Sequence, residues 1–269
     1  MILLLCIIVY IEGDILMEFG ICTAIENLER FADTGIDFIE VNASAIASKT
    51  DEAFADAKAV ADRFPGMVRA CNGLVPATLR LTGPDVDFEK IKAYSEKCFG
   101  RLAELGVTTV VFGSSAAKQV PDGFSHEEAM AQLVRVMHIF ADAAEKHGQI
   151  VVVEPLNFGE CNIINTVADS VALMKATDRP NVYAHVDFYH LMQNGETLSE
   201  LAPQVQYIPH VHIASPVKRI VPTFDDGAHY GAFLKTLRDN GFDGTVSYEG
   251  KSKLDEETVR TLMSFLRSL

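Results

Sequence analysis

The sequence is short of cationic residues, and this deficit argues against a nucleic-acid partner. Lys and Arg together number 23, against 37 Asp and Glu, which gives a formal net charge of −14. Proteins that bind DNA or RNA draw most of their affinity from basic side chains that neutralise phosphates. We therefore expect no nucleic-acid partner. An acidic surface also serves to keep a cytoplasmic enzyme in solution.

The chain also lacks a paired-cysteine motif and a hydrophobic run long enough to cross a membrane. Its five cysteines include no Cys-x-x-Cys pair, so reduced thiols in a cytoplasmic enzyme are the simplest interpretation. The apolar stretch 1–10 is too short for a bilayer span, and it lacks the basic start and the cleavage site of a signal peptide. We expect residues 1–16 to be an N-terminal extension, Met17 to be the true start, and 17–269 to form the folded unit.

Short apolar segments alternate with longer amphipathic segments eight times from Met17 onward. The apolar segments have at most eight residues and are rich in Val, Ile, Phe and Tyr, as buried parallel strands are. Eight strand–helix units in about 250 residues predict a single closed (β/α)8 TIM barrel. The predicted strands are 19–23, 37–42, 68–73, 108–114, 149–155, 182–188, 207–214 and 245–250. The predicted helices are 88–106, 126–148, 166–177, 194–201, 230–241 and 255–269.

A glycine-rich phosphate-binding turn is missing where an open, doubly wound sheet would need one. That fold normally places such a turn directly after its first strand. The run ICTAIEN at 21–27 contains no glycine. The sequence therefore favours the closed barrel over the open sheet.

Four polar side chains lie at the ends of four successive predicted strands. They are Glu154, Asp187, His212 and Glu249, separated by 33, 25 and 37 residues, about one strand–helix unit each. Barrel enzymes keep their chemistry at the carboxyl ends of the strands, so we expect these side chains to converge. Three carboxylates in one place repel one another unless a cation is present. This donor set suits one divalent ion, with Mn²⁺ the first choice and Mg²⁺, Co²⁺ or Zn²⁺ as alternatives.

Other ionisable residues lie close to these four in the sequence. His185 and His210 each precede a candidate ligand by two residues, so we expect both to form hydrogen bonds inside the barrel. Glu40 is an acid at the end of the second strand, and we expect it to hold a loop or a neighbouring polar group. Three more polar residues follow the fifth, sixth and seventh strands: Glu160, His190 and Arg219.

Four motifs together resemble the sugar isomerase/epimerase family of xylose isomerase-like barrels, most of all its ketose 3-epimerases of the tagatose/psicose type. The motifs are EPLN with a second glutamate six residues after its own, HVDFYH, HVHIA and SYEG. The segments CNGLVPATLRLTGPDVD and VVFGSSAAKQVPDGF are similar to this family as well. The resemblance spans 17–269 and implies a TIM barrel with a metal-dependent site for a sugar.

The resemblance also implies a role for each candidate residue. The four strand-end residues match the metal ligands of the family, and two of them, Glu154 and Glu249, match its acid/base pair. The three loop residues match groups that hold the carbonyl end and the hydroxyl groups of the substrate: Glu160, His190 and Arg219. Family members often carry Arg-x-x-Pro-Gly after the histidine of strand seven. Here Thr223 replaces that glycine, so Lys218 is an alternative to Arg219.

The expected function is epimerisation of a ketose at C3 through a cis-enediolate. A divalent ion chelated by the carbonyl and the adjacent hydroxyl oxygen acidifies the neighbouring C–H. One glutamate removes that proton, and a second glutamate on the opposite face returns one and inverts the centre. The expected partner is a small sugar. From the resemblance we also expect a homodimer or homotetramer.

Other functions would use a similar site. An aldose–ketose isomerase, a hydroxypyruvate-type isomerase and a keto-inositol dehydratase share the metal and the enediolate. A non-catalytic sugar-binding barrel is an alternative of another class, but it would be expected to lack a ligand or a glutamate, and none is missing. An endonuclease IV-like function is disfavoured, because strands three and four end RACNG and FGSS without the histidines of a three-zinc cluster.

Overall fold

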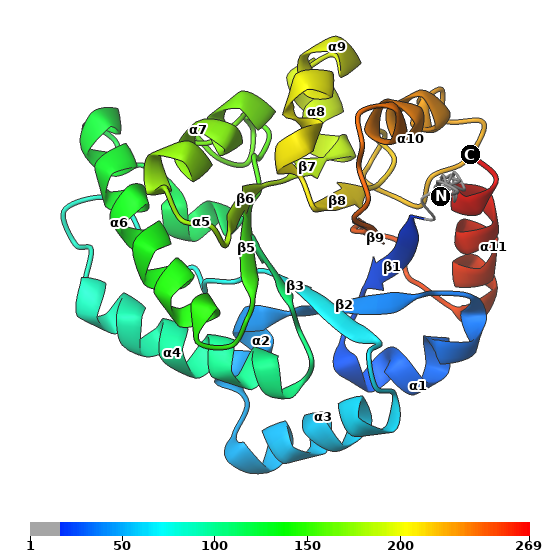
Figure 1. Ribbon diagram of the computed structural model, residues 1–269, viewed down its shortest axis with the longest axis horizontal. Coiled ribbons are helices and arrows are strands. Elements are labelled where there is room, and N and C mark those ends of the chain that lie inside the picture. The colour runs from blue at the N-terminus through cyan, green and yellow to red at the C-terminus, as the bar shows by residue number, and fades with distance from the viewer. Residues whose placement is uncertain (1–16) are drawn as a thin grey trace, which may run out of the picture.

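The computed structural model describes residues 17–269, which form a parallel β-barrel with helices around it (Figure 1). The predicted N-terminal extension, 1–16, lies outside the described residues. Each predicted strand contains or overlaps an observed one, because short runs of β-branched and aromatic residues pack well on a buried sheet. The strands are β1 (Glu18–Cys22), β2 (Phe38–Asn42), β3 (Val68–Asn72), β4 (Thr109–Phe112), β5 (Ile150–Val153), β6 (Val182–Ala184), β7 (Val186–Asp187), β8 (His210–Ile213) and β9 (Thr245–Tyr248).

The barrel closes through the sixth predicted strand, which the structure divides into β6 and β7. Only His185 separates these two pieces, yet β6 pairs with β5 and β7 pairs with β8. The sheet order β6-β5-β4-β3-β2-β1-β9-β8-β7 therefore begins and ends with the two parts of one strand. The predicted (β/α)8 barrel is confirmed.

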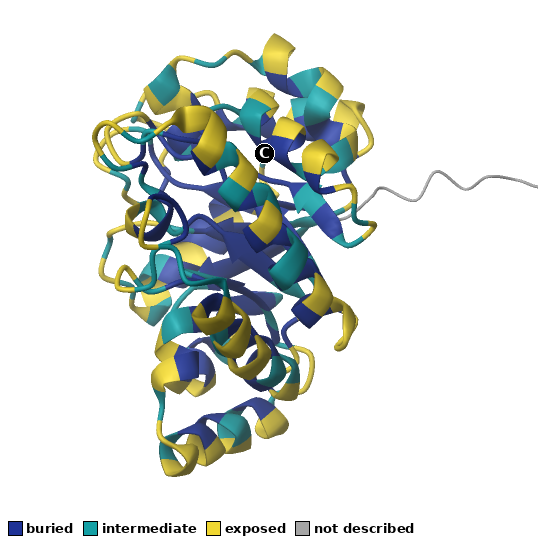
Figure 2. Cartoon of the chain, turned by 90° about the vertical axis from the view of Figure 1, so that its left-hand side faces the viewer, coloured by how far each residue is buried: buried dark blue, intermediate teal, exposed yellow. Residues whose placement is uncertain are grey.

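Helices cover the outside of the barrel and bury its strands. In Figure 2 the central strands are buried, whereas the outward faces of the helices are exposed. None of the helices within 17–269 has the length and hydrophobicity that a membrane span requires. The helices are α1 (Leu28–Phe31), α2 (Ala43–Ser48), α3 (Asp51–Arg63), α4 (Phe88–Glu104), α5 (Ser115–Lys118), α6 (His126–Glu145), α7 (Val167–Thr177), α8 (Phe188–Asn194), α9 (Leu198–Leu201), α10 (Tyr230–Asp239) and α11 (Glu256–Arg267), with 3₁₀ turns η1 (Ile25–Asn27), η2 (Ala32–Thr34) and η3 (Ala202–Tyr207).

The predicted helix 194–201 is right only in its second half, which is α9, and it misses the separate helix α8 before it. Helix α8 begins directly after β7, because the Asp187 carboxylate accepts a hydrogen bond of 2.7 Å from the backbone N–H of Tyr189 and caps the helix. It ends at Gly195, which has the left-handed φ of 73° that favours glycine. The short α9 then starts at Thr197 with a capping box. The strand end that carries Asp187 thus leads straight into a helix.

Candidate functional site

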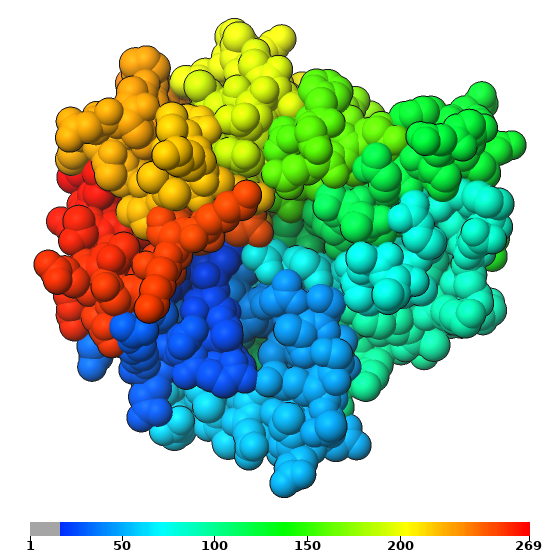
Figure 3. Space-filling view, turned by 180° about the vertical axis from the view of Figure 1, so that it is seen from behind, coloured from blue at the N-terminus to red at the C-terminus, as the bar shows by residue number. Residues whose placement is uncertain are grey.

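The four strand-end residues come together at the carboxyl ends of β5, β7, β8 and β9. One donor atom from each of Glu154, Asp187, His212 and Glu249 lies within 4.8 Å of the others. The parallel register sets Asp187 beside His212 on neighbouring strands, and inward-pointing side chains at one height meet in the middle of a barrel. Seen from behind, segments from the start, middle and end of the chain surround a central hollow (Figure 3).

His212 lies close to both glutamates through one ring nitrogen. Its Nδ1 is 3.2 Å from Oε1 of Glu154 and 3.4 Å from Oε2 of Glu249. Its Nε2 is 3.0 Å from Oε1 of Glu40. Burial alone would lower the pKa of His212, but the carboxylates of Glu40 and Glu249 outweigh it and raise that pKa well above its ordinary value. A metal ion at Nδ1 would therefore displace a proton.

Arg219 approaches the same acids from the loop after β8. Its Nη2 is 3.0 Å from Oδ2 of Asp187 and forms an ion pair with Glu249. Burial would raise the pKa of Glu249, but His212 and Arg219 together lower it to about 2. Glu249 is therefore ionised at neutral pH. Lys218, the alternative to Arg219, has an exposed side chain.

Asn157, in the loop after β5, forms hydrogen bonds with two more of the predicted residues, His190 and Glu160, at the edge of the cluster. The backbone N–H of Asn157 donates to Nδ1 of His190 over 3.1 Å, and its side-chain amide donates to Glu160 over 3.0 Å. Nε2 of His190 is 3.6 Å from Oδ2 of Asp187, and Oε2 of Glu160 is 3.8 Å from Nη1 of Arg219. Glu160, His190 and Arg219 thus lie around the four strand-end residues.

The site is also contacted by three residues that the sequence did not predict there, one in β3, one directly after β4 and one in α5. Asn72 donates a hydrogen bond of 2.8 Å to Oε1 of Glu249. The fully buried Lys118 donates one of 2.9 Å to the backbone carbonyl of Glu154. Gly113 leaves room for the same glutamate, since a Cβ there would overlap its Oε2. An asparagine, a glycine and a single lysine form no pattern of acids and bases that could be recognised in the sequence.

A hydrogen-bond network lies beneath the cluster in the barrel interior. Glu40 accepts from Nε2 of His210 and of His212, and His210 also bonds Thr245 at 2.6 Å. Burial would raise the pKa of Glu40, but the two histidines hold it well below its usual range. The expectations for Glu40 and His210 are confirmed. The expectation for His185 is wrong, because neither of its ring nitrogens has a hydrogen-bond partner among the described residues.

The donor set fits a divalent cation. Glu154, Asp187 and His212 are almost completely buried, and Glu249 is one-fifth exposed, with 22% of its side-chain surface accessible. Burial raises the pKa of Asp187, which shows how poorly this environment solvates another negative charge. Oxygen-rich sets with one imidazole suit hard and borderline ions such as Mg²⁺ and Mn²⁺. A bound cation would offset the repulsion among the three acids.

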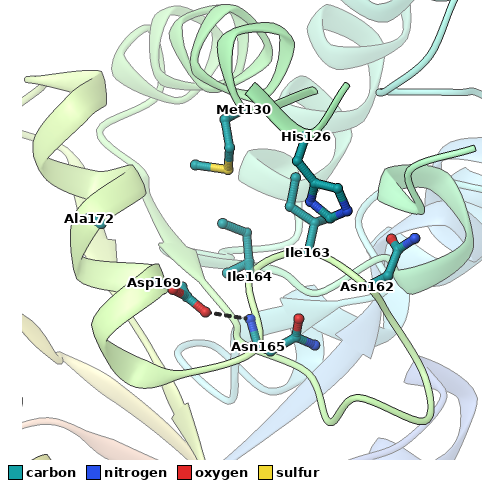
Figure 4. A pocket seen from close by; sticks show the side chains of 8 residues that line it. All are labelled: His126, Met130, Asn162, Ile163, Ile164, Asn165, Asp169 and Ala172. Atoms are coloured by element: carbon teal, nitrogen blue, oxygen red, sulfur yellow. Dashed lines mark hydrogen bonds between the residues drawn. The ribbon is translucent and has the colours of Figure 1, made fainter. Parts of the chain in front are cut away.

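A surface pocket of about 320 Å³ is lined in part by the loop after β5, and none of the predicted site residues lines it (Figure 4). Two asparagines from its wall hold the loop in place. The Asn165 amide donates to the carbonyls of Leu156 and Cys161, each over 2.8 Å. The Asn162 side chain bonds both backbone groups of Val120 at 2.9 Å. The polar groups of these two asparagines already have hydrogen-bond partners. The strand-end cluster is therefore the better candidate for the functional site.

Comparison with known proteins gives a family and several relatives. Residues 28–269 match the family described as "Xylose isomerase-like TIM barrel". A ketose 3-epimerase from Arthrobacter globiformis is 28% identical over 158 residues, which are 56% of this chain and 52% of the relative. A 3-dehydro-D-guloside 4-epimerase from Escherichia coli K12 is 29% identical over 138 residues, 49% of this chain and 51% of the relative. The aligned regions thus span about half the length of these two relatives.

A solved structure extends the likeness to nearly the whole chain. The D-psicose 3-epimerase with D-tagatose from Clostridium cellulolyticum H10 superimposes with a TM-score of 0.81, covering 94% of this chain and 99% of the other. The sequence identity is 20%. At this identity the likeness shows a shared fold.

Proposed function

The chain belongs to the family of xylose isomerase-like TIM barrels, and on this premise we propose that it epimerises a ketose at C3. The observation that carries the proposal is the pair Glu154 and Glu249, whose carboxylates lie 3.2 Å and 3.4 Å from Nδ1 of His212. Inversion of a carbon centre needs two proton-transfer groups, whereas a 1,2-isomerase can work with one. The relative named as a ketose 3-epimerase supports this choice of reaction.

The proposed cofactor is one Mn²⁺ ion held by the four strand-end residues. When bound, the ion would withdraw electron density from the carbonyl and hydroxyl oxygens of the sugar and so make the neighbouring proton easier to remove. Three carboxylates and one imidazole nitrogen match the ligand preference of such an ion. The ligands are Glu154, Asp187, His212 and Glu249.

The two glutamates share the proton transfer between the faces of the sugar. Glu249 is ionised and 22% of its side-chain surface is accessible, so it can take a proton from a substrate that enters from solvent. Glu154 is 5% exposed, and its Oε1 lies 3.2 Å from Nδ1 of His212, the same nitrogen that Glu249 approaches. One epimer presents its C3 proton to one glutamate and the other epimer to the second. The same pair therefore serves both directions of the reaction.

Glu160, His190 and Arg219 are proposed to bind the sugar. Nε2 of His190 is buried and has no hydrogen-bond partner within 17–269, so it is available to a hydroxyl or carbonyl oxygen. Arg219 is charged at every relevant pH and can hold an oxygen that gains negative charge. Glu160 is 36% exposed and can accept hydrogen bonds from hydroxyl groups at the open side of the site.

Incubation of the protein with a panel of free ketoses and Mn²⁺ in D₂O, followed by NMR, tests the proposal. We expect deuterium at C3 together with a new C3 epimer, because the returned proton exchanges with solvent. Deuterium at C1 with an aldose product would overturn the proposal in favour of an isomerase. Deuterium at C4 of a 3-keto sugar would overturn it in favour of a 4-epimerase.

The variant Asp187→Asn tests the proposed metal site. Asparagine also caps helices, so α8 should remain formed, but the variant lacks one anionic ligand. We expect loss of Mn²⁺-dependent turnover. The wild-type protein should also gain about 2.7 kcal/mol of stability at a Mn²⁺ concentration 100 times its Kd, and the variant should gain less. A wild-type protein that binds no divalent ion and turns over no sugar would favour a non-catalytic sugar-binding barrel.

A further inference from the structure

The proposed function leaves Glu40 without a role, although its carboxylate is completely buried. Glu40 lies in β2, on the far side of His212 from the two glutamates. Its oxygens lie 3.0 Å from Nε2 of His212 and 3.0 Å from Nε2 of His210. An isolated carboxylate at this depth would be strongly unfavourable. The two imidazoles are therefore what stabilises it.

The hydrogen bonds of this network are mutually consistent in one arrangement. An ionised carboxylate can only accept hydrogen bonds, so Nε2 of both histidines must carry a hydrogen. His210 then accepts at Nδ1 from the hydroxyl of Thr245, 2.6 Å away. His212 is left with its Nδ1 directed toward Glu154 and Glu249. The nitrogen that faces the strand-end cluster is thus the one that can release its proton and coordinate a cation.

We propose that Glu40 is a positioning residue that holds the His212 ring with Nδ1 toward the metal ion. Rotation of the ring by half a turn would remove its bond to Glu40 and would turn the Cδ2 carbon, which cannot coordinate a metal, toward the cation. Carboxylates that orient a ligating histidine in this way typically contribute 10-fold to 100-fold in metal affinity. The inference rests on the proposed function in one respect, namely that a divalent ion binds at the strand-end residues.

His185 shows that the barrel interior does not by itself require such a bond. Its ring packs edge-to-face on His212 with the centroids 4.4 Å apart, and both of its nitrogens lack hydrogen-bond partners among the described residues. His212 contacts the strand-end cluster and is bonded to a carboxylate, whereas the ring nitrogens of His185 do neither.

Titration of metal-free protein with Mn²⁺, with free ion counted by EPR and no sugar present, tests the proposal. Glu40→Gln keeps the side-chain length but places an amide NH₂ near one of the two imidazole N–H groups. We expect the Kd for Mn²⁺ to rise by about 10-fold to 100-fold. A Kd within about 3-fold of wild type would overturn the proposal.

Thr245→Val is the matched control, because it removes a hydrogen bond from His210 in the same network and leaves the Glu40–His212 bond in place. We expect its Kd for Mn²⁺ to remain within about 3-fold of wild type. An equal loss of affinity in both variants would mean that any disturbance of the interior weakens the site. That result would also overturn the specific role of Glu40.

A measurement on the wild-type protein covers the case in which Glu40→Gln does not fold. In ¹⁵N-labelled, Mg²⁺-loaded protein we expect the NMR signals of His212 to show a hydrogen on Nε2 and none on Nδ1. A hydrogen on Nδ1 would overturn the proposal. Failure to bind Mn²⁺ in the wild type would contradict both this proposal and the proposed function, whereas equal binding by Glu40→Gln would contradict the role of Glu40 alone.

Discussion

The part of the barrel from β5 to β9 and the part from β1 to β4 contribute different kinds of side chain to the candidate site. The later strands supply the groups with acid–base or ligand chemistry: Glu154, Asp187, His212 and Glu249. The earlier strands and the helix after β4 supply groups that contact those four from the side or from beneath: Glu40, Asn72, Gly113 and Lys118. The later strands carry the four residues of the cluster. The earlier part supplies the hydrogen bonds and the space that fix the positions of those residues.

This division teaches that a cluster of like charges depends for its geometry on neighbours outside the cluster. Glu249 is held by Asn72 on one oxygen and by Arg219 on the other. Glu154 fits because Gly113 has no side chain. If the division is real, substitutions in the later strands should abolish chemistry, and substitutions in the earlier strands should weaken it by smaller and graded amounts.

The largest effect is expected for Glu154→Gln and Glu249→Gln. Each variant removes one of the two proton-transfer groups, and a general acid or base typically contributes 10²-fold to 10⁴-fold. We expect kcat for C3 epimerisation to fall by at least about 10²-fold in either variant. The measurement is steady-state kinetics with the ketose identified by NMR.

Glu160→Gln is the control for these two variants, because it neutralises a carboxylate at the open edge of the same site. We expect it to raise KM more than it lowers kcat. Turnover that survives in Glu154→Gln or Glu249→Gln would contradict the acid/base role of that glutamate. It would also remove the contrast between the two parts of the barrel.

The next effect is expected for Gly113→Ala in the earlier part. The added methyl group would occupy the space of the Glu154 carboxylate, so that carboxylate must move. A displacement of about 1 Å can reduce turnover by about 10²-fold. We expect a loss of this order in kcat, measured with the ketose substrate, while the far-UV circular dichroism stays unchanged.

Gly100→Ala is the matched control for the glycine. Gly100 lies within α4, where a Cβ would be 3.8 Å from the nearest side chain, that of His147. We expect wild-type kcat and a gain of about 0.5–1 kcal/mol in the free energy of unfolding, because alanine is the better helix former. Equal kcat in the two alanine variants would show that Glu154 has room to move.

The barrel and its strand-end cluster were predictable because both follow from local patterns. Alternating apolar and amphipathic segments define the strand–helix units, and the topology then places successive strand ends beside one another. Glu154 and Asp187 attract notice in the sequence because an acid directly after an apolar run is unusual. The family resemblance added roles for Glu160, His190 and Arg219, and the structure places all three around the cluster.

The supporting residues could not be predicted, since their importance depends on contacts between distant segments. Gly113 matters only because Glu154 lies opposite to it, and Lys118 only because it reaches a carbonyl 36 residues away. The prediction of helix 194–201 missed α8 for a related reason. Asp187 was interpreted as a ligand alone, whereas its second oxygen also caps α8 and so starts the helix earlier.

A smaller effect is expected for Asn72→Ala. The variant removes a hydrogen bond of 2.8 Å to the ionised Glu249, and bonds to charged groups contribute about 1.5–3 kcal/mol. We expect kcat/KM to fall about 10-fold, as measured by initial rates.

The matched control is Asn42→Ala, in the residue that pairs with Asn72 on the neighbouring strand. Asn42 caps α2, so this variant should lose about 1 kcal/mol of stability and keep wild-type kcat/KM. If the two variants lose turnover equally, contact with Glu249 is not what distinguishes Asn72.

The smallest effect on stability at neutral pH is expected for Lys118→Met. The variant removes a buried cation that has no ion-pair partner within 17–269, but it also leaves the Glu154 carbonyl without its donor. These two changes oppose each other. We expect the free energy of unfolding at pH 7 to change by less than about 1 kcal/mol, as measured by urea unfolding.

The pH dependence of stability separates the two opposing contributions of Lys118. Burial lowers the pKa of Lys118 in the folded protein below the ordinary value of 10.5, which applies to the unfolded chain. At a pH between the lowered pKa and 10.5, the unfolded chain therefore binds more protons than the folded protein. The stability of the wild type should therefore rise relative to that of Lys118→Met as pH increases through this window toward 10.5. A stability difference that stays constant with pH would contradict a depressed pKa. A large loss of kcat without any change in stability would instead place Lys118 with the reactive residues of the later strands, and the contrast between the two parts of the barrel would then fail at that position.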